Sequence, residues 1–109
     1  MISSLGFQTL DLDFNDKETV NRILKKISLM PCCKELWIRY SASMNGFHVL
    51  IRCSKPDCDL CRLVFDSPIR YGADLKRPPH RRNVLWDRKS YYKAGNCITL
   101  EAGEWRRVK

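Results

Sequence analysis

The sequence predicts a single α+β domain in which one sheet carries two helices on one face. Short segments with alternating apolar and polar residues are typical of strands, and one longer segment repeats its apolar residues at helical spacing. A chain of 109 residues can bury one hydrophobic core but not a second, independent one. Apolar residues make up 44% and charged residues 29%, which is the ordinary composition of a folded chain.

The first strand is expected at residues 7–13, where Leu and Asp alternate. A helix follows to about residue 29, because Asn15 or Asp16 can cap its first turn. Pro31 ends this helix. Its apolar residues recur at the spacing of one buried stripe, formed by Val20, Ile23, Leu24 and Ile27.

Two more strands are expected at residues 35–41 and 47–53, again from alternating polarity. Between them, Asn45 and Gly46 are typical of a hairpin turn, since both residue types tolerate positive φ. The chain therefore predicts a helix followed by a β-hairpin.

The next segment predicts a short helix that passes through Leu60 and Phe65 and stops near Pro68. Residues 69–75 are expected to form a fourth strand. The order is then βαββαβ, the split βαβ or ferredoxin-like arrangement, whose second sheet face is open. This core spans residues 7–77 of the single domain 1–109.

The C-terminal extension 78–109 is basic and predicts a further β-hairpin from residues 83–89 and 97–101. Net charge is +8, from 20 basic and 12 acidic residues. Such a basic excess makes nucleic acid, DNA or RNA, the leading partner class, while a merely solubilising surface is the alternative. The aromatic residues between the charges, which could stack on bases, are Trp86, Tyr91, Tyr92 and Trp105.

Strand parity predicts which side chains meet on the open sheet face. Asp11 and Asp13, two residues apart, share a face and can share a divalent cation; Mg²⁺ and Mn²⁺ prefer such oxygens. A turn or capping role is the alternative for this pair. For Asp74 the alternative is a surface ion pair, and for His48 a structural hydrogen bond. The full predicted set on this face is Asp11, Asp13, Trp37, Arg39, His48, Arg52, Arg70 and Asp74.

The chain has no segment apolar enough to span a bilayer, and its start lacks the basic and apolar regions of a leader. We therefore expect it inside a cell, without a membrane partner. Its six cysteines require an explanation there, because cytosol keeps thiols reduced. Cys53, Cys58 and Cys61 have a C-x4-C-x2-C spacing that leaves three alternatives: Zn²⁺ ligation, a disulfide of the kind found in hyperthermophile cytoplasm, and free thiols. Iron–sulfur ligation is disfavoured at a strand end of a basic protein. The preferred interpretation of the other three is buried free thiols, for Cys32, Cys33 and Cys97.

These motifs together resemble the catalytic core of archaeo-eukaryotic primases and primase-polymerases, an RRM-like βαββαβ unit. The family's Asp-hydrophobic-Asp motif matches Asp11 and Asp13, and the end of its Ser-Gly-x-x-Gly-x-His motif matches Gly46 and His48. In place of the motif's Ser-Gly stands Ala42-Ser43, with the nearest serines at Ser41 and Ser43. The family also carries a third Asp, to which Asp74 corresponds by position.

The resemblance implies a minimal, viral or plasmid-type replication protein in the cytoplasm of its cell or host. It implies two Mg²⁺ or Mn²⁺ ions on Asp11, Asp13 and Asp74 for nucleotidyl transfer, with DNA or RNA and a nucleoside triphosphate as partners. A homodimer or a replication partner subunit is compatible with it, and a non-catalytic RRM-like nucleic-acid-binding module is the alternative. A third alternative is a small zinc-stabilised adaptor. The expected nucleotide ligands are Ser41, Ser43, Gly46, His48, Arg52 and Lys89, and the expected nucleic-acid contacts are Arg39, Arg70, Arg77, Arg81, Arg82, Arg88 and Lys93.

Overall fold

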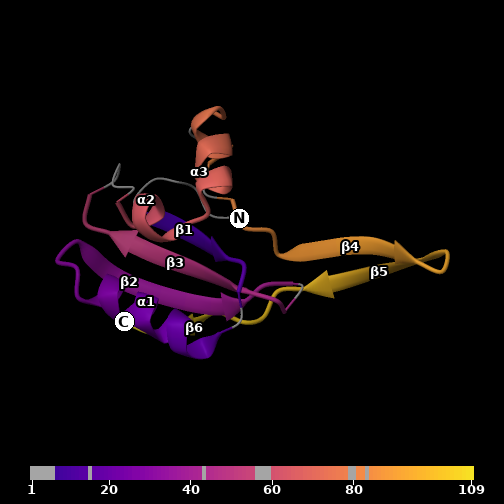
Figure 1. The fold of residues 1–109 in the computed structure, drawn as a ribbon, viewed down its shortest axis with the longest axis horizontal. Coiled ribbons are helices and arrows are strands. Elements are labelled where there is room, and N and C mark those ends of the chain that lie inside the picture. Colours follow the sequence, from indigo (N-terminus) through magenta and orange to yellow (C-terminus); the bar gives the residue numbers. More distant parts are fainter. Residues whose placement is uncertain (1–6, 15, 43, 56–59, 79–80, 83) are drawn as a thin grey trace.

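The computed structural model describes residues 7–14, 16–42, 44–55, 60–78, 81–82 and 84–109 of the chain. It confirms the α+β class, with antiparallel strands and a C-terminal hairpin (Figure 1). The elements in chain order are β1 (Phe7–Leu12), α1 (Lys17–Ser28), β2 (Cys33–Tyr40), β3 (Phe47–Cys53), α2 (Leu60–Phe65), α3 (Pro68–Leu75), β4 (Arg88–Lys93), β5 (Asn96–Glu101) and β6 (Arg106–Arg107).

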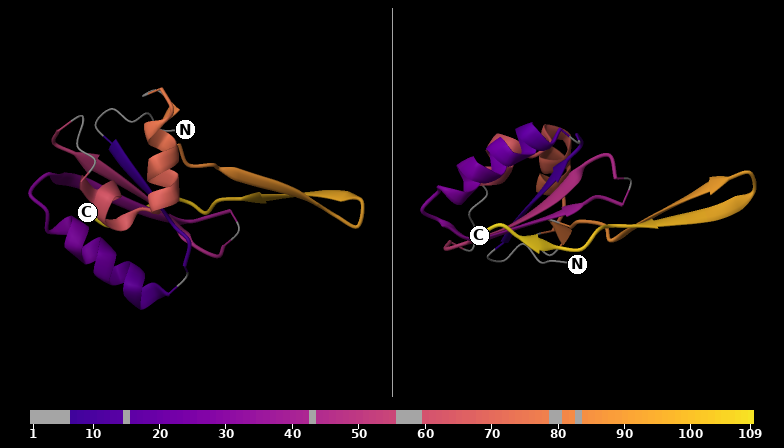
Figure 2. Two further views of the ribbon diagram at one scale, coloured as in Figure 1. Left: turned by 45° about the horizontal axis from the view of Figure 1, so that its top comes forward. Right: turned by 90° about the horizontal axis from the view of Figure 1, so that it is seen from below.

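The main sheet has the strand order β1-β3-β2-β6, and β4 and β5 form a separate two-stranded sheet. The helices lie on one side of the main sheet, as the sequence predicts (Figure 2). In the register of the three long strands, His48 lies opposite Asp11 of β1 and opposite Arg39 of β2. Polar residues from three strands therefore meet in one row.

The hydrophobic core lies between the sheet and the helices. Helix α1 begins at the Asp16 cap, whose carboxylate accepts a hydrogen bond from the Glu18 backbone N–H. Among the described residues, no helix has the length and apolar character needed to cross a bilayer. The core side chains of the first strands and α1 are Leu10, Leu12, Val20, Leu24, Ile27, Leu36, Ile38, Phe47, Val49 and Ile51.

Position 46 requires glycine because a side chain there would clash with the backbone of β1, a requirement that the sequence did not predict. A Cβ atom at this position would lie 2.1 Å from the carbonyl oxygen of Leu12. Positive φ occurs instead at Met44, with a value of 58°. The glycine therefore lets the end of β1 lie directly against the β2–β3 loop, beside Asp13.

The predicted strand at residues 69–75 is wrong, because this segment forms helix α3. Pro68 occupies the first turn of α3, where its missing N–H costs nothing, and so begins this helix as well as following α2. Ion pairs at helical spacing also favour the helix, since Arg70 Nη1 lies 2.6 Å from Asp66 Oδ2 and Arg77 Nη1 lies 3.1 Å from Asp74 Oδ1.

Side chains of the α2–α3 region take the place of the missing strand at the edge of β1. The backbone N–H of Asp11 donates to Asp66 Oδ1 at 3.1 Å, and Arg70 Nη1 donates to the Thr9 carbonyl at 3.0 Å. An edge strand presents backbone groups that must find partners, and here two charged side chains supply them. The fourth strand of the main sheet is β6, which pairs with β2 at the opposite edge.

The face away from the helices is partly covered, although the sequence predicts an open one. Leu50 at its centre is buried, and Arg39 contacts Asp87 and Trp105 from the C-terminal part of the chain. The predicted hairpin is present, but its first strand covers residues 88–93 instead of 83–89. Ala94 and Gly95 form its two-residue turn with φ values of 52° and 80°, as a tight hairpin requires.

Candidate functional site

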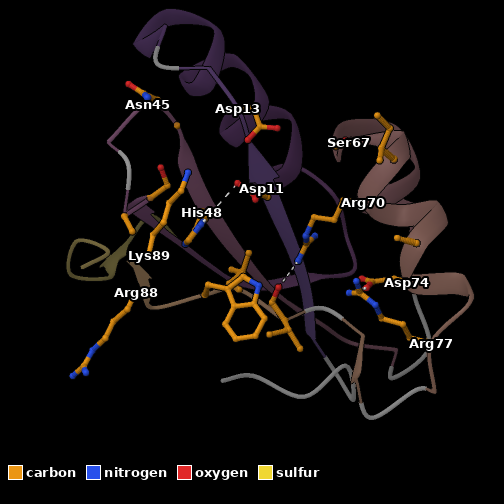
Figure 3. A pocket seen from close by; sticks show the side chains of 18 residues that line it. Asp11, Asp13, Asn45, His48, Ser67, Arg70, Asp74, Arg77, Arg88 and Lys89 are labelled. Atoms are coloured by element: carbon orange, nitrogen blue, oxygen red, sulfur yellow. Dashed lines mark hydrogen bonds and ion pairs between the residues drawn. The ribbon is translucent and has the colours of Figure 1, made fainter. Parts of the chain in front are cut away.

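A pocket of about 690 Å³ lies at the end of β1, between the β2–β3 loop, helix α3 and the start of β4 (Figure 3). Its size is within the usual range for small-molecule ligands. Two adjacent carboxylates, Asp11 and Asp13, line it together with polar groups of the β2–β3 loop. The imidazole and cationic side chains that line it are His48, Arg70, Arg77, Arg88 and Lys89.

A row of polar side chains crosses the sheet and ends at this pocket, which His48 and Asp11 line. Arg39 Nε donates to His48 Nδ1 at 3.0 Å, and Arg39 Nη1 donates to Asp87 Oδ1 at 2.9 Å. The Arg39 guanidinium also lies over the Trp105 ring, 4.5 Å from its centroid. On the other side of the imidazole, His48 Nε2 lies 3.8 Å from Asp11 Oδ1. Arg39 is therefore fixed by Asp87 and Trp105 and holds His48 in turn.

The contact with Arg39 determines the tautomer of His48. A guanidinium only donates hydrogen bonds, so Nδ1 must accept, and the neutral ring carries its proton on Nε2. Burial, followed by the charges of Arg39 and Arg70, lowers the His48 pKa from 6.5 to about 4. At neutral pH the pocket therefore contains an uncharged N–H donor beside Asp11 (Figure 3).

Asp11 lies in an environment that disfavours two neighbouring negative charges. Burial and the charge of Asp13 raise the Asp11 pKa, whereas Arg70 and Lys89 act against this rise. A cation between the two carboxylates would relieve their repulsion, so this donor pair fits Mg²⁺ or Mn²⁺, which commonly binds one or two carboxylates plus water and phosphate. Among the described residues, no three His, Cys, Asp or Glu side chains are grouped to hold a metal ion.

Asp74 lines the pocket from helix α3, and the prediction that it extends from a fourth strand is wrong. Its carboxylate is buried between two guanidinium groups, with Arg62 Nη2 at 2.8 Å and Arg77 Nη1 at 3.1 Å. Arg62 Nη2 also lies 3.0 Å from Asp66 Oδ2. A buried carboxylate with two Arg partners is already neutralised, so the structure gives Asp74 an ion-pair role in the wall of the pocket.

The predicted nucleotide ligands divide into two groups. Ser41, Gly46, His48 and Lys89 all line the pocket. Arg52 is at the opposite end of β3, where its guanidinium lies 2.7 Å from Glu35 Oε2 and lowers the Glu35 pKa. Ser43 lies outside the described residues.

The predicted nucleic-acid contacts are also separated by the structure. Arg39 and Arg70 are occupied inside the protein, since both make several hydrogen bonds to neighbouring side chains or carbonyls. Arg82 donates to the Leu75 and Arg77 carbonyls at the end of α3. The described cations of this set that are exposed on the surface are Arg77, Arg81, Arg88 and Lys93.

The cysteines do not form a group that could hold a metal ion in the part of the chain that the structure describes. Cys53 and Cys61 are buried in the hydrophobic core, and Gln8 Nε2 lies 2.8 Å from Cys53 Sγ. Cys58, the third member of the predicted group, lies outside the described residues. Cys33 is a buried free thiol as predicted, and Cys32 is a partly buried one. Cys97 is exposed on β5, so the prediction of a buried thiol is wrong there.

Sequence reasoning missed four residues that support this site from outside the pocket, Arg62, Asp66, Asp87 and Trp105. A spacing of four connects Arg62, Asp66, Arg70 and Asp74, and this repeat predicts a charged helix face. No comparable signal connects Asp87 or Trp105 with Arg39, because these contacts depend on how the C-terminal segment crosses the sheet. Comparison of the chain with family models, curated proteins and solved structures finds no match.

Proposed function

We propose that this protein binds the phosphate groups of a nucleotide or of a nucleic-acid strand end, with a divalent cation held by Asp11 and Asp13. The observation that carries the proposal is the meeting of these two carboxylates with several cations and a neutral imidazole in one pocket. Phosphate alone would be repelled by Asp11 and Asp13, and a cation alone by the basic residues. A metal–phosphate complex satisfies both sets of charges.

The residues of the pocket have different proposed roles according to their charge. Asp11 and Asp13 would contribute oxygen ligands to Mg²⁺ or Mn²⁺, which commonly retains water and phosphate oxygens in its remaining positions. His48 supplies an uncharged N–H donor in a position fixed by Arg39, and Lys89 supplies a positive charge beside Asp11. A bound metal ion would stabilise negative charge developing on a phosphoryl group.

This assignment supports a primase-like core, with nucleotidyl transfer as the reaction of that class.

One observation favours a second candidate, a module that binds nucleic acid without catalysis. Asp74, the expected third metal ligand, is engaged by Arg62 and Arg77. Two-metal transfer needs carboxylates to hold both ions, and this engagement leaves two of the expected three.

Calorimetry with Mn²⁺, in the presence and absence of a nucleoside triphosphate, tests the proposal. We expect the triphosphate to tighten Mn²⁺ binding to the wild type, because its phosphates complete the metal shell. Replacement of both ligands, Asp11→Asn and Asp13→Asn, should abolish this binding. Glu104→Gln is the matched control, since it removes one exposed carboxylate that does not line the pocket.

The outcomes separate the two candidates. Equal Mn²⁺ binding by the wild type and the double variant would contradict the proposed metal site. Triphosphate binding that persists in chelator would favour the module without catalysis. If metal-dependent binding is found, extension of a primer on a template strand by the wild type alone would establish nucleotidyl transfer.

A further inference from the structure

The β4–β5 hairpin presents one face that continues from the pocket. Side chains two residues apart share a face of a strand, so Lys89, Tyr91 and Lys93 of β4 lie in line. We call these three residues the hairpin face. Lys89 lines the pocket, and its charge acts on Asp11, which places the first member of the face at the pocket edge (Figure 3). The other two follow outward along the strand.

The hairpin extends away from the body of the protein, and every residue of β4 is exposed (Figure 1). An isolated two-stranded hairpin is at best marginally stable in water. Tyr91 is directly paired with Ile98 of β5, so an apolar side chain supports its ring while 40% of the tyrosine stays exposed. The hairpin face therefore offers an aromatic platform between two lysines.

We propose that the hairpin face binds a single-stranded nucleic acid whose end occupies the pocket. This inference rests on the proposed function, and it adds the path of the strand. Alternating cations and aromatic rings are what single strands require, because the lysines neutralise phosphates and the ring stacks on a base. With six residues, β4 is about 20 Å long, enough to contact several nucleotides beyond the pocket.

Charge argues against a second copy of the chain as the occupant of this face. Two copies related by a twofold axis would bring Lys89 and Lys93 of both chains together, on proteins that each carry a net charge of +8. A polyanion is instead attracted by these lysines, and its affinity for the protein rises with each phosphate that they neutralise. The arrangement of charge therefore selects nucleic acid.

Fluorescence anisotropy with a labelled single strand of about 12 nucleotides, within the site sizes of such proteins, tests this proposal. In the presence of Mn²⁺, Tyr91→Ala should weaken binding about tenfold, the loss expected for one stacked base. Lys93→Gln should reduce the slope of log K against log salt by about 0.7. Tyr92→Ala is the matched control, because Tyr92 is exposed on the opposite face of the same strand and should leave binding unchanged.

Mononucleotide binding measured in parallel distinguishes this proposal from the one on which it rests. All three variants should bind Mn²⁺ and nucleoside triphosphate like the wild type, which also verifies that they fold. Equal oligonucleotide affinity of Tyr91→Ala and the wild type would overturn the proposal while leaving the pocket assignment intact. Tighter binding of a duplex than of a single strand, or a dimer that Tyr91→Ala dissociates, would also overturn it.

Discussion

Protonation of His48 should make the protein lose stability as the pH falls from 6.5 toward 4. The folded protein keeps this imidazole neutral down to a pKa of about 4, because it is buried beside Arg39, whereas the unfolded chain takes up the proton near 6.5. Between these values the unfolded state binds more protons, so acid favours unfolding. The difference between the two pKa values corresponds to about 3 kcal/mol, all of which is present above pH 6.5 and lost below pH 4.

Urea unfolding at a series of pH values, on the wild type and His48→Gln, measures this contribution. Glutamine does not titrate, and its amide oxygen can still accept the hydrogen bond from Arg39. Carboxylates with a lowered pKa, such as Asp87 and Glu35, also destabilise the folded protein in acid, but both proteins contain them. The difference between the two stability profiles therefore isolates the imidazole.

We expect the wild type to lose about 3 kcal/mol more than His48→Gln between pH 6.5 and pH 4. A histidine resonance that titrates near 4 by NMR would give the same information directly. Parallel profiles for the two proteins, or an imidazole that titrates near 6.5, would refute the assignment of a buried neutral His48 held by Arg39.

Two further changes, each with a matched control, test the supports of the pocket. Gly46→Ala should destabilise the protein by about 1–3 kcal/mol or more in thermal unfolding, because its Cβ would meet a backbone oxygen at 2.1 Å. Gly72→Ala is the control, since its Cβ meets nothing within 4 Å, and an equal loss in both variants would contradict the close-approach argument. Arg62→Met should cost about 3–5 kcal/mol in urea unfolding, because it leaves buried carboxylates without their shared partner. Arg22→Met, in an exposed pair, should change stability by about 0.5 kcal/mol or less, and a similar small effect at Arg62 would show that its ion pairs are dispensable.

The elements with strong periodicity could be predicted from the sequence. Alternation located β1, β2 and β3, and the apolar stripe and Asp16 cap located α1. The same parity argument brought Asp11, His48 and Arg39 to one face, where the structure has them in register. Local patterns suffice here because each of these elements buries one face against the same core.

The segment from Pro68 to Leu75 could not be predicted in the same way. Residues 69–75 alternate weakly, and their helical state depends on ion pairs with α2 and on the β1 backbone. Arg39 was expected to contact nucleic acid, but it contacts Asp87 and Trp105 instead. Asp87 lies 48 residues later in the chain, and Trp105 lies further still. Long-range contacts of this kind leave no local pattern.

Paramagnetic broadening of amide NMR signals by Mn²⁺ tests the central assignment most directly, because it locates the metal within the fold. With a nucleoside triphosphate present, we expect the strongest broadening at Asp11, Asp13 and Gly46, and its loss in the Asp11→Asn, Asp13→Asn variant. Broadening centred on another carboxylate, or unchanged in the variant, would contradict a metal–phosphate site in this pocket.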